Sequence, residues 1–289
     1  MLVHGNNLLQ KEQHTEKYND KKCKSLLAEI RRQYNIWTQA NEKLIGPFAK
    51  PDDGDLALLT ERVKLFTRYK DFIDQQKYAE AFDSRSNLHS SVLEEFVYYL
   101  FRDLVLNMGH ASMIGKATTL KDMFFAPPSY ADMITHAHPR FEGKDHDFVI
   151  GATITLDIRC KGEPTGETKE LQLPAVAIEC KTYLDKTMLE SSSTAAEQIR
   201  ARTPNAIYII VSEWLKLTED INLKKYKVEQ VYVLRRQKNT DREYRYSDEY
   251  VKNPISVETV AHLYELVRNH LTNPWMTGVK NGLERGYLL

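Results

Sequence analysis

The chain has 289 residues, and its 40 Lys and Arg balance its 40 Asp and Glu, so the formal net charge is zero at neutral pH. This balance excludes a globally basic nucleic-acid-binding protein, although local basic patches remain possible. The three cysteines form no Cys-x-x-Cys pair, so neither a disulfide framework nor a zinc site is indicated, and a reducing cytoplasm is expected. No apolar run approaches the roughly 18 residues of a membrane span, and the polar start predicts no signal peptide.

The sequence pattern of the first part of the chain predicts helices, and nothing in these helices has catalytic character. Residues 1–20 are polar and predict a loose arm. Apolar residues at helical spacing predict helices over about 24–44 and 56–82. We therefore expect two regions, a helical N-terminal region at 1–83 and a second domain at 84–289.

The second region predicts a helix followed by alternating strands and helices. Ser90 or Ser91 would cap a helix over 92–106, and Glu94 and Glu95 lie in its first turn, where acids suit the helix dipole. The stretch from there to Asp147 is predicted to be irregular. The expected elements that follow are strands at 147–158, 171–183, 206–211 and 228–234, a helix at 188–201, and a late amphipathic helix at 257–271.

This order of elements predicts an α/β fold. A helix between two strands usually makes a right-handed crossover to a parallel neighbour. The first two strands are joined by a turn and are expected to pair as an antiparallel hairpin. The result is a mixed β-sheet core flanked by helices.

A charged pair in an apolar strand is the main clue to function. Glu179 and Lys181 are two positions apart within 174–184, so on a strand their side chains share one face. Burying ionised groups without partners is costly, and an acid beside an amine at a strand end suggests a divalent metal and an activated water. The alternative is an ordinary strand-end ion pair that reaches water. The chain's other two Glu-x-Lys pairs lie in polar, glycine-containing loops.

A second acid precedes this pair in the expected hairpin. Asp147 lies at the entry to the preceding strand, so antiparallel pairing would bring its carboxylate to the Glu-x-Lys pair. Two carboxylates, the main-chain carbonyl of Cys180 and waters would form an oxygen-rich shell suited to Mg²⁺. Lys181 would orient the attacking water or neutralise charge on a phosphate. Asp145 and Asp157 are alternatives for the role of Asp147.

These residues resemble a known nuclease signature. Asp147 followed, after a hairpin, by Glu179-Cys180-Lys181 resembles the PD-(D/E)xK pattern, with His146 where that pattern has proline. Longer stretches are similar to one subunit of the BbvCI-type heterodimeric type II restriction endonucleases, which cut a short asymmetric CCTNAGC-like site. The similar stretches are 91–96, 144–151, 174–181, 195–200, 202–204 and 232–237.

The resemblance implies a restriction-endonuclease-like fold, a homologous second subunit, double-stranded DNA as the substrate, Mg²⁺ as the cofactor and a bacterial cytoplasmic location. Each subunit would hydrolyse one strand and leave a 5′-phosphate and a 3′-hydroxyl. Asp147, Glu179 and Lys181 would be catalytic. The two acids and the carbonyl of Cys180 would bind the metal, with Glu95 of the early helix as a further candidate ligand.

Several cations are candidates for DNA contacts. The polar loop that begins at Arg235 carries more cations than acids, and we hypothesise that Arg235, Arg236 and Lys238 hold phosphates. A solvated loop is the alternative. Gln198 and Arg202 share one face of the helix after the Glu-x-Lys strand, where they would reach DNA or cover the sheet edge.

Two other functions remain open at this point. The chain could be a catalytically inert DNA-recognition subunit, or a repair or recombination nuclease with the same core. The complete set of Asp147, Glu179 and Lys181 argues against an inert subunit, because buried charges without a role are costly to keep.

Overall fold

The structure is a computed structural model that describes residues 2–83, 87–239, 244–275 and 279–287. The helices, in chain order, are α1 (Val3–Glu12), α2 (Lys21–Lys43), α3 (Asp55–Ile73), α4 (Gln76–Phe82), α5 (Asn87–Val105), α6 (Tyr130–Thr135), α7 (Lys186–Arg202), α8 (Val257–Thr272) and α9 (Val279–Arg285). The strands are β1 (Ser112–Phe125), β2 (Pro139–Ile158), β3 (Glu167–Leu184), β4 (Ile207–Leu215) and β5 (Gln230–Val233). Within these described ranges, every helix is too short or too polar to cross a membrane.

The strands form one mixed sheet in the order β1-β2-β3-β4-β5. Strands β1 and β2, and β2 and β3, pair antiparallel, whereas β3 and β4, and β4 and β5, pair parallel. Helix α7 connects the parallel strands β3 and β4, as a crossover requires. The predicted mixed sheet flanked by helices is confirmed.

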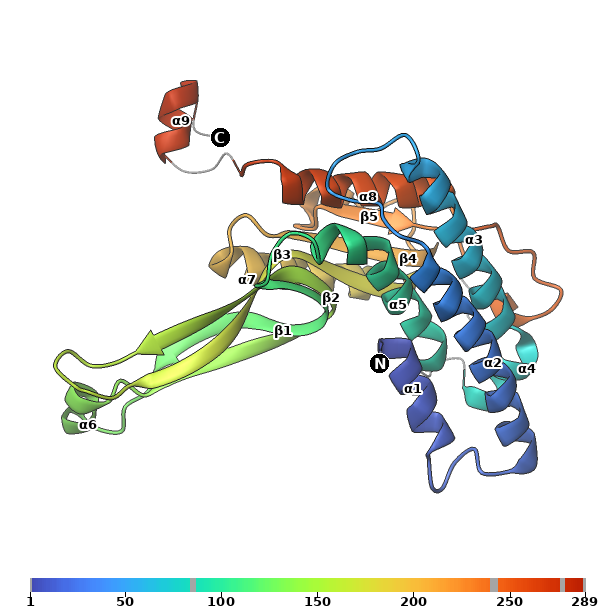
Figure 1. The fold of residues 1–289 in the computed structure, drawn as a ribbon, viewed down its shortest axis with the longest axis horizontal. Helices are drawn as coiled ribbons and strands as arrows, with labels where there is room; N and C mark the ends of the chain where they lie inside the picture. Colours follow the sequence, from blue (N-terminus) through green and yellow to red (C-terminus); the bar gives the residue numbers. More distant parts are fainter. Residues whose placement is uncertain (1, 84–86, 240–243, 276–278, 288–289) are drawn as a thin grey trace.

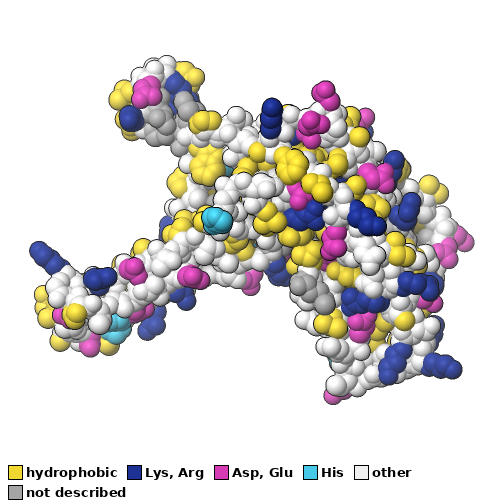
Figure 2. All heavy atoms as spheres, in the orientation of Figure 1, with side chains coloured by type: hydrophobic (Ala, Val, Ile, Leu, Met, Phe, Trp, Pro, Cys, Tyr) yellow, Lys and Arg dark blue, Asp and Glu magenta, His cyan; other side chains and the backbone are white. Residues whose placement is uncertain are grey.

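Strands β1, β2 and β3 extend beyond the core as a long arm (Figure 1). The segments that flank the two ends of β2 meet at the arm tip, where Cys160 Sγ donates a hydrogen bond to the Met133 carbonyl at 3.4 Å. Strand β2 therefore bends back on itself. At Gly151, close to a shift in strand register, a Cβ would lie 2.0 Å from the Leu173 carbonyl oxygen. The molecule is hollowed between this arm and the N-terminal helices (Figure 2).

The arm corrects the prediction of irregular structure before Asp147. Strand β1 and the first half of β2 occupy much of that stretch. Most side chains of β1 are exposed or half-buried, so its sequence lacks the strict alternation of apolar and polar residues that marks a strand with one buried face.

The N-terminal segment is also ordered, contrary to the expected loose arm. Helix α1 packs against α5, and the side chains of His4 and Leu8 are fully buried. The His4 ring lies 2.7 Å from the Tyr69 hydroxyl and 3.0 Å from the Ser91 hydroxyl. Tertiary contacts of this kind stabilise a short polar helix that local sequence does not predict.

Two helix boundaries also differ from the prediction. Helix α5 begins at Asn87, so Ser90 and Ser91 lie inside it rather than at its cap, because buried Leu88 extends the apolar face by one turn. The single helix expected over 56–82 is two helices, α3 and α4.

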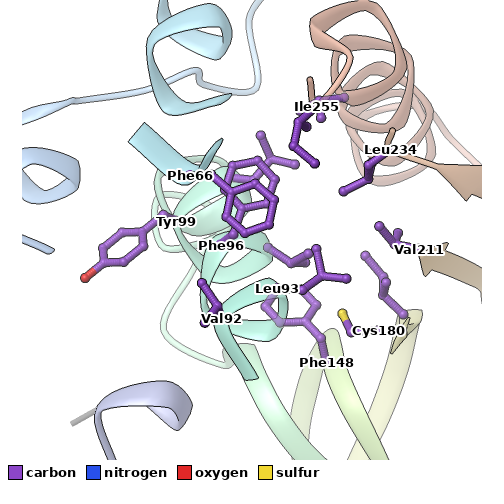
Figure 3. Close-up of a cluster of buried hydrophobic side chains, with 14 of the residues drawn as sticks. Phe66, Val92, Leu93, Phe96, Tyr99, Phe148, Cys180, Val211, Leu234 and Ile255 are labelled. Atoms are coloured by element: carbon purple, nitrogen blue, oxygen red, sulfur yellow. The ribbon is translucent and has the colours of Figure 1, made fainter. Parts of the chain in front are cut away.

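The main core joins the N-terminal helices to the sheet. The rings of Phe66 from α3 and Phe96 from α5 stack with centroids 4.2 Å apart. Phe148 and Val211 of the sheet and Ile255 before α8 surround this pair (Figure 3). The proposed boundary between residues 83 and 84 adjoins residues outside the described ranges, and apolar side chains from both sides of it share one core.

Candidate active site

Three charged side chains meet at the base of the arm. Phe148 of β2 pairs with Ile178 of β3, which brings Asp147 and Glu179 to neighbouring positions. The Lys181 ammonium lies 3.3 Å from Asp147 Oδ2 and 2.5 Å from Glu179 Oε1. The three side chains are only 21–27% exposed, so their charges interact more strongly than in bulk water.

Two further groups fix the carboxylates. The Cys180 backbone N–H donates to Asp147 Oδ2 at 3.0 Å. The hydroxyl of Tyr208, on the neighbouring strand β4, donates to Glu179 Oε2 at 2.9 Å. Tyr208 was not expected from the sequence, where it reads as one more apolar residue of a buried strand, so only the parallel pairing of β3 and β4 reveals its role.

The three groups shift one another's pKa values. Burial by itself would lower the pKa of Lys181, but the charges of Asp147 and Glu179 raise it above its ordinary value. For Glu179, burial opposes ionisation, yet the Lys181 charge and the hydrogen bonds from Lys181 and Tyr208 lower the pKa. For Asp147, burial and the charge of Glu179 raise the pKa. Asp147 is therefore the acid of the pair that takes up a proton more readily.

A fourth group, Glu94 of α5, lines a pocket beside Asp147 and Lys181. The pocket has a volume of about 320 Å³, and Glu94, Lys116, Asp147, Lys181 and Asn7 are among its lining residues. Burial, followed by the charge of Asp147, raises the pKa of Glu94 to about 7. Within the described part of the chain, Glu94 Oε2 is buried without a hydrogen-bond partner. An unpaired carboxylate oxygen close to other acids fits a cation site.

The structure corrects the expected position of Glu95. Its Oε2 accepts hydrogen bonds from the backbone N–H groups of His4 at 2.9 Å and Gly5 at 3.2 Å, and its Oε1 accepts one from the Tyr34 hydroxyl at 2.9 Å. Successive helical residues point about 100° apart, so Glu95 faces α1 while Glu94 faces the pocket. The sequence gives the two neighbours equal standing, and only the packing of α1 separates them.

The alternative acids lie on the arm. Thr118 Oγ1 donates to Asp145 Oδ1 at 2.5 Å, and Thr168 Oγ1 donates to Asp157 Oδ1 at 2.5 Å. Both acids are thus engaged with threonines of a neighbouring strand.

Arg235 is not placed to hold a phosphate, contrary to the hypothesis. Its side chain is 1% exposed. The guanidinium lies 3.3 Å from Glu213 Oε2 and 2.7 Å from Asp71 Oδ1, and it stands over the Trp214 ring at 5.0 Å from the centroid. Acids from β4 and α3 therefore neutralise it inside the protein.

The other predicted DNA contacts are more accessible. Arg236 pairs with Glu258 at 2.6 Å, and Lys238 pairs with Glu219. Arg202, at the end of α7, pairs with Asp122 of the arm, and Gln198 is half-buried on α7. Their role in DNA binding stays a prediction.

Comparisons with known proteins place the chain among the restriction endonucleases. A solved structure described as native BbvCI A2B2 tetramer at low resolution matches with a TM-score of 0.69 and 18% sequence identity, over 93% of this chain and 95% of that chain. Residues 85–288 match the family model described as Bpu10I restriction endonuclease, and the chain belongs to that family. No curated protein matches the chain significantly. The predicted restriction-endonuclease resemblance is confirmed.

Proposed function

We propose that this chain is one of two cleaving subunits of a Mg²⁺-dependent type II restriction endonuclease and hydrolyses one strand of double-stranded DNA at a short asymmetric site. Family membership supports the restriction endonuclease activity. The observation that carries the residue assignment is the ion-pair cluster of Asp147, Glu179 and Lys181, two members of which, Asp147 and Lys181, line one pocket with Glu94.

The acids of this pocket would hold the cation. Asp147, Glu179 and Glu94 are the candidate side-chain ligands, with the Cys180 carbonyl as a main-chain ligand. In the described ranges, no group of three or more His, Cys, Asp or Glu side chains is arranged to hold a metal ion by itself, so main-chain oxygens and waters would have to complete the shell. An open carboxylate set suits Mg²⁺, which keeps several of its waters. When bound, the cation would supply Lewis acidity and neutralise charge on the phosphodiester.

The chain's own side chains would perform the remaining steps. Lys181, held protonated by the two acids beside it, would orient the attacking water and stabilise the negative charge that develops on the phosphate. Tyr208 and the Cys180 N–H would keep the two carboxylates in place. In the metal-free chain the pKa of Glu94 is about 7, so this carboxyl would release a proton when it binds the cation near neutral pH.

A second subunit would complete the enzyme. The matched structure is described as an A2B2 tetramer, and we propose that this chain acts with a homologous partner in the bacterial cytoplasm. The active site of each subunit would then cut one strand. An asymmetric site is read by two different protein surfaces, which fits two related but unequal subunits.

The test is strand-specific cleavage by the enzyme assembled with its partner. The chain is co-expressed with the adjacent reading frame, and a plasmid with a mapped site is digested in Mg²⁺. Lys181→Glu should convert cutting to nicking of one strand. Lys169→Glu, the same charge reversal in the Glu-x-Lys pair of the exposed arm, is the control and should still cut both strands.

Three results would contradict the proposal. Cleavage of both strands by a folded Lys181→Glu enzyme would exclude the assigned lysine. If the partner's site is disabled and no nick remains, this chain is an inert recognition subunit. Cleavage that follows DNA structure rather than a fixed sequence would indicate a repair or recombination nuclease.

A further inference from the structure

The catalytic pocket continues along the N-terminal helix. A second pocket of about 320 Å³ shares Asn7 and Asn87 with the catalytic pocket. We name this second pocket the α1 groove; its lining residues are Asn7, Gln10, Lys11, His14, Lys17, Tyr18 and Asn87. Helix α1 lies beside α5 (Figure 1). The shared asparagines join the α1 groove to the surroundings of Asp147.

The α1 groove is cationic, and no acid is among the lining residues that the structure describes. Within the described ranges, neither Lys11 nor Lys17 forms an ion pair, whereas Arg236 and Lys238 do. Burial lowers the pKa of Lys11, and the charge of Asp83 opposes this shift only partly. Because a partly desolvated ammonium gains from an anionic partner, the α1 groove is better suited to bind an anion than the loop that begins at Arg235.

The donors of the α1 groove are held in place. His14 Nδ1 accepts hydrogen bonds from the backbone N–H groups of Glu16 at 3.2 Å and Lys17 at 3.1 Å. Neutral His14 therefore carries its proton on Nε2, which can donate. The Lys11 ammonium stands over the Tyr18 ring, 4.8 Å from the centroid. Ammonium, imidazole and amide donors are the groups that proteins use to contact DNA phosphates.

We propose that the α1 groove binds the sugar–phosphate backbone of the cleaved strand, at phosphates next to the scissile bond. This inference rests on the proposed function. A strand whose scissile phosphate lies at Asp147 continues past the shared asparagines into the α1 groove. There Lys11 and Lys17 neutralise its charge, and His14 donates a hydrogen bond that helps to fix its register. The contacts are to the backbone, so they set position rather than base preference.

The test measures the salt dependence of DNA binding by the assembled enzyme. Affinity for a duplex that contains the site is measured by fluorescence anisotropy in EDTA, over a series of salt concentrations. Lost phosphate contacts reduce the slope of log K against log salt by about 0.9 each. We expect Lys11→Ala/Lys17→Ala to reduce the slope by about 1.8. The double variant Lys43→Ala/Lys64→Ala, of exposed lysines outside the α1 groove, is the control and should leave it unchanged.

Replacing the phosphate next to the scissile bond with a neutral methylphosphonate tests whether this phosphate is the ligand of the α1 groove. The replacement should weaken binding by the wild-type enzyme at least several-fold and have no further effect on Lys11→Ala/Lys17→Ala. An unchanged salt slope in a folded double variant overturns the inference about the α1 groove. The proposed function is unaffected by that result as long as the wild-type enzyme cleaves DNA. Loss of subunit assembly in the double variant, detected by size-exclusion chromatography, would instead assign the α1 groove to an acidic partner surface and also overturn the inference. Failure of the wild-type enzyme to cut any site refutes the proposed function itself.

Discussion

Neighbouring glutamates on α5 should respond in opposite ways to one substitution. Burial raises the pKa of both Glu94 and Glu95 to about 7. Glu94 Oε2 has no hydrogen-bond partner among the described residues, whereas the Glu95 carboxylate accepts three hydrogen bonds. Replacing each with methionine, which is similar in length and uncharged, separates the cost of a buried charge from the value of its hydrogen bonds.

The magnitude for Glu94 follows from its raised pKa. The pKa of Glu94 rises from its ordinary value of 4.5 to about 7 on folding. Between pH 4.5 and about pH 7, the folded state therefore binds the proton more tightly than the unfolded chain does. The free energy of unfolding therefore falls as pH rises through this window, and the loss is complete above it. The difference between these two pKa values corresponds to about 3 kcal/mol of stability. This figure is an upper bound, because Glu94 is partly exposed. Glu94→Met should stabilise the metal-free chain at pH 8 by up to this amount and by less than about 1 kcal/mol at pH 5.

Glu95→Met should destabilise the chain most clearly at pH 5. At that pH the wild-type Glu95 is protonated and uncharged, so the substitution removes no buried charge. It does leave the N–H groups of His4 and Gly5 and the hydroxyl of Tyr34 without their acceptor. Each buried donor left unpaired costs about 1–3 kcal/mol, so we expect the three donors together to cost about 3–9 kcal/mol.

Urea unfolding in EDTA, followed by tryptophan fluorescence at pH 5 and pH 8, measures both effects. The reasoning fails if Glu94→Met is less stable than the wild type at pH 8, or if its difference from the wild type is the same at both pH values. Either result would mean that the Glu94 carboxylate is solvated or paired and does not face the catalytic pocket unpaired. In the assembled enzyme, Glu94→Met should also abolish cleavage of one strand, so that gain of stability accompanies loss of activity.

Two further predictions concern buried cations. Lys70→Met removes the ammonium shared by two buried acids, Asp74 and Glu213, and should destabilise the chain by about 3–5 kcal/mol in urea. Lys64→Met, in an exposed pair, should cost less than about 1 kcal/mol, and equal costs would mean that Lys70 is hydrated. Arg235→Ala should lower the melting temperature and leave the salt slope of DNA binding unchanged, because its guanidinium is buried, and a flattened slope in a folded Arg235→Ala variant would restore the phosphate hypothesis.

The sheet and its charged pair could be predicted because local patterns specify them. The apolar runs of β3 and β4 identify central strands, and alternation along β3 puts Glu179 and Lys181 on one face. The hairpin turn then brings Asp147 to Glu179. These steps need only strand geometry and one pairing, so few tertiary contacts could overturn them.

The elements that the sequence did not predict depend on distant contacts. The acidic partners of Arg235 come from α3 and β4, so one cation of a basic sequence stretch is buried in an ion-pair cluster that the local sequence does not indicate. Strand β1 is mostly exposed or half-buried and lacks a one-sided pattern. Helix α1 is short and polar, and it is held by the buried Glu95 and His4 rather than by its own propensity.

The packing of α1 changes how the N-terminal region should be understood. The family match begins at residue 85 and leaves out α1, yet Asn7 of α1 lines the pocket of the candidate active site. On α5, Glu95 accepts hydrogen bonds from the first N–H groups of α1, while Glu94 faces the pocket. One turn of α5 therefore docks α1 and supplies an acid to the site. Because α1 supplies part of the pocket wall through Asn7, we propose that α1 belongs to the same structural unit as the candidate active site.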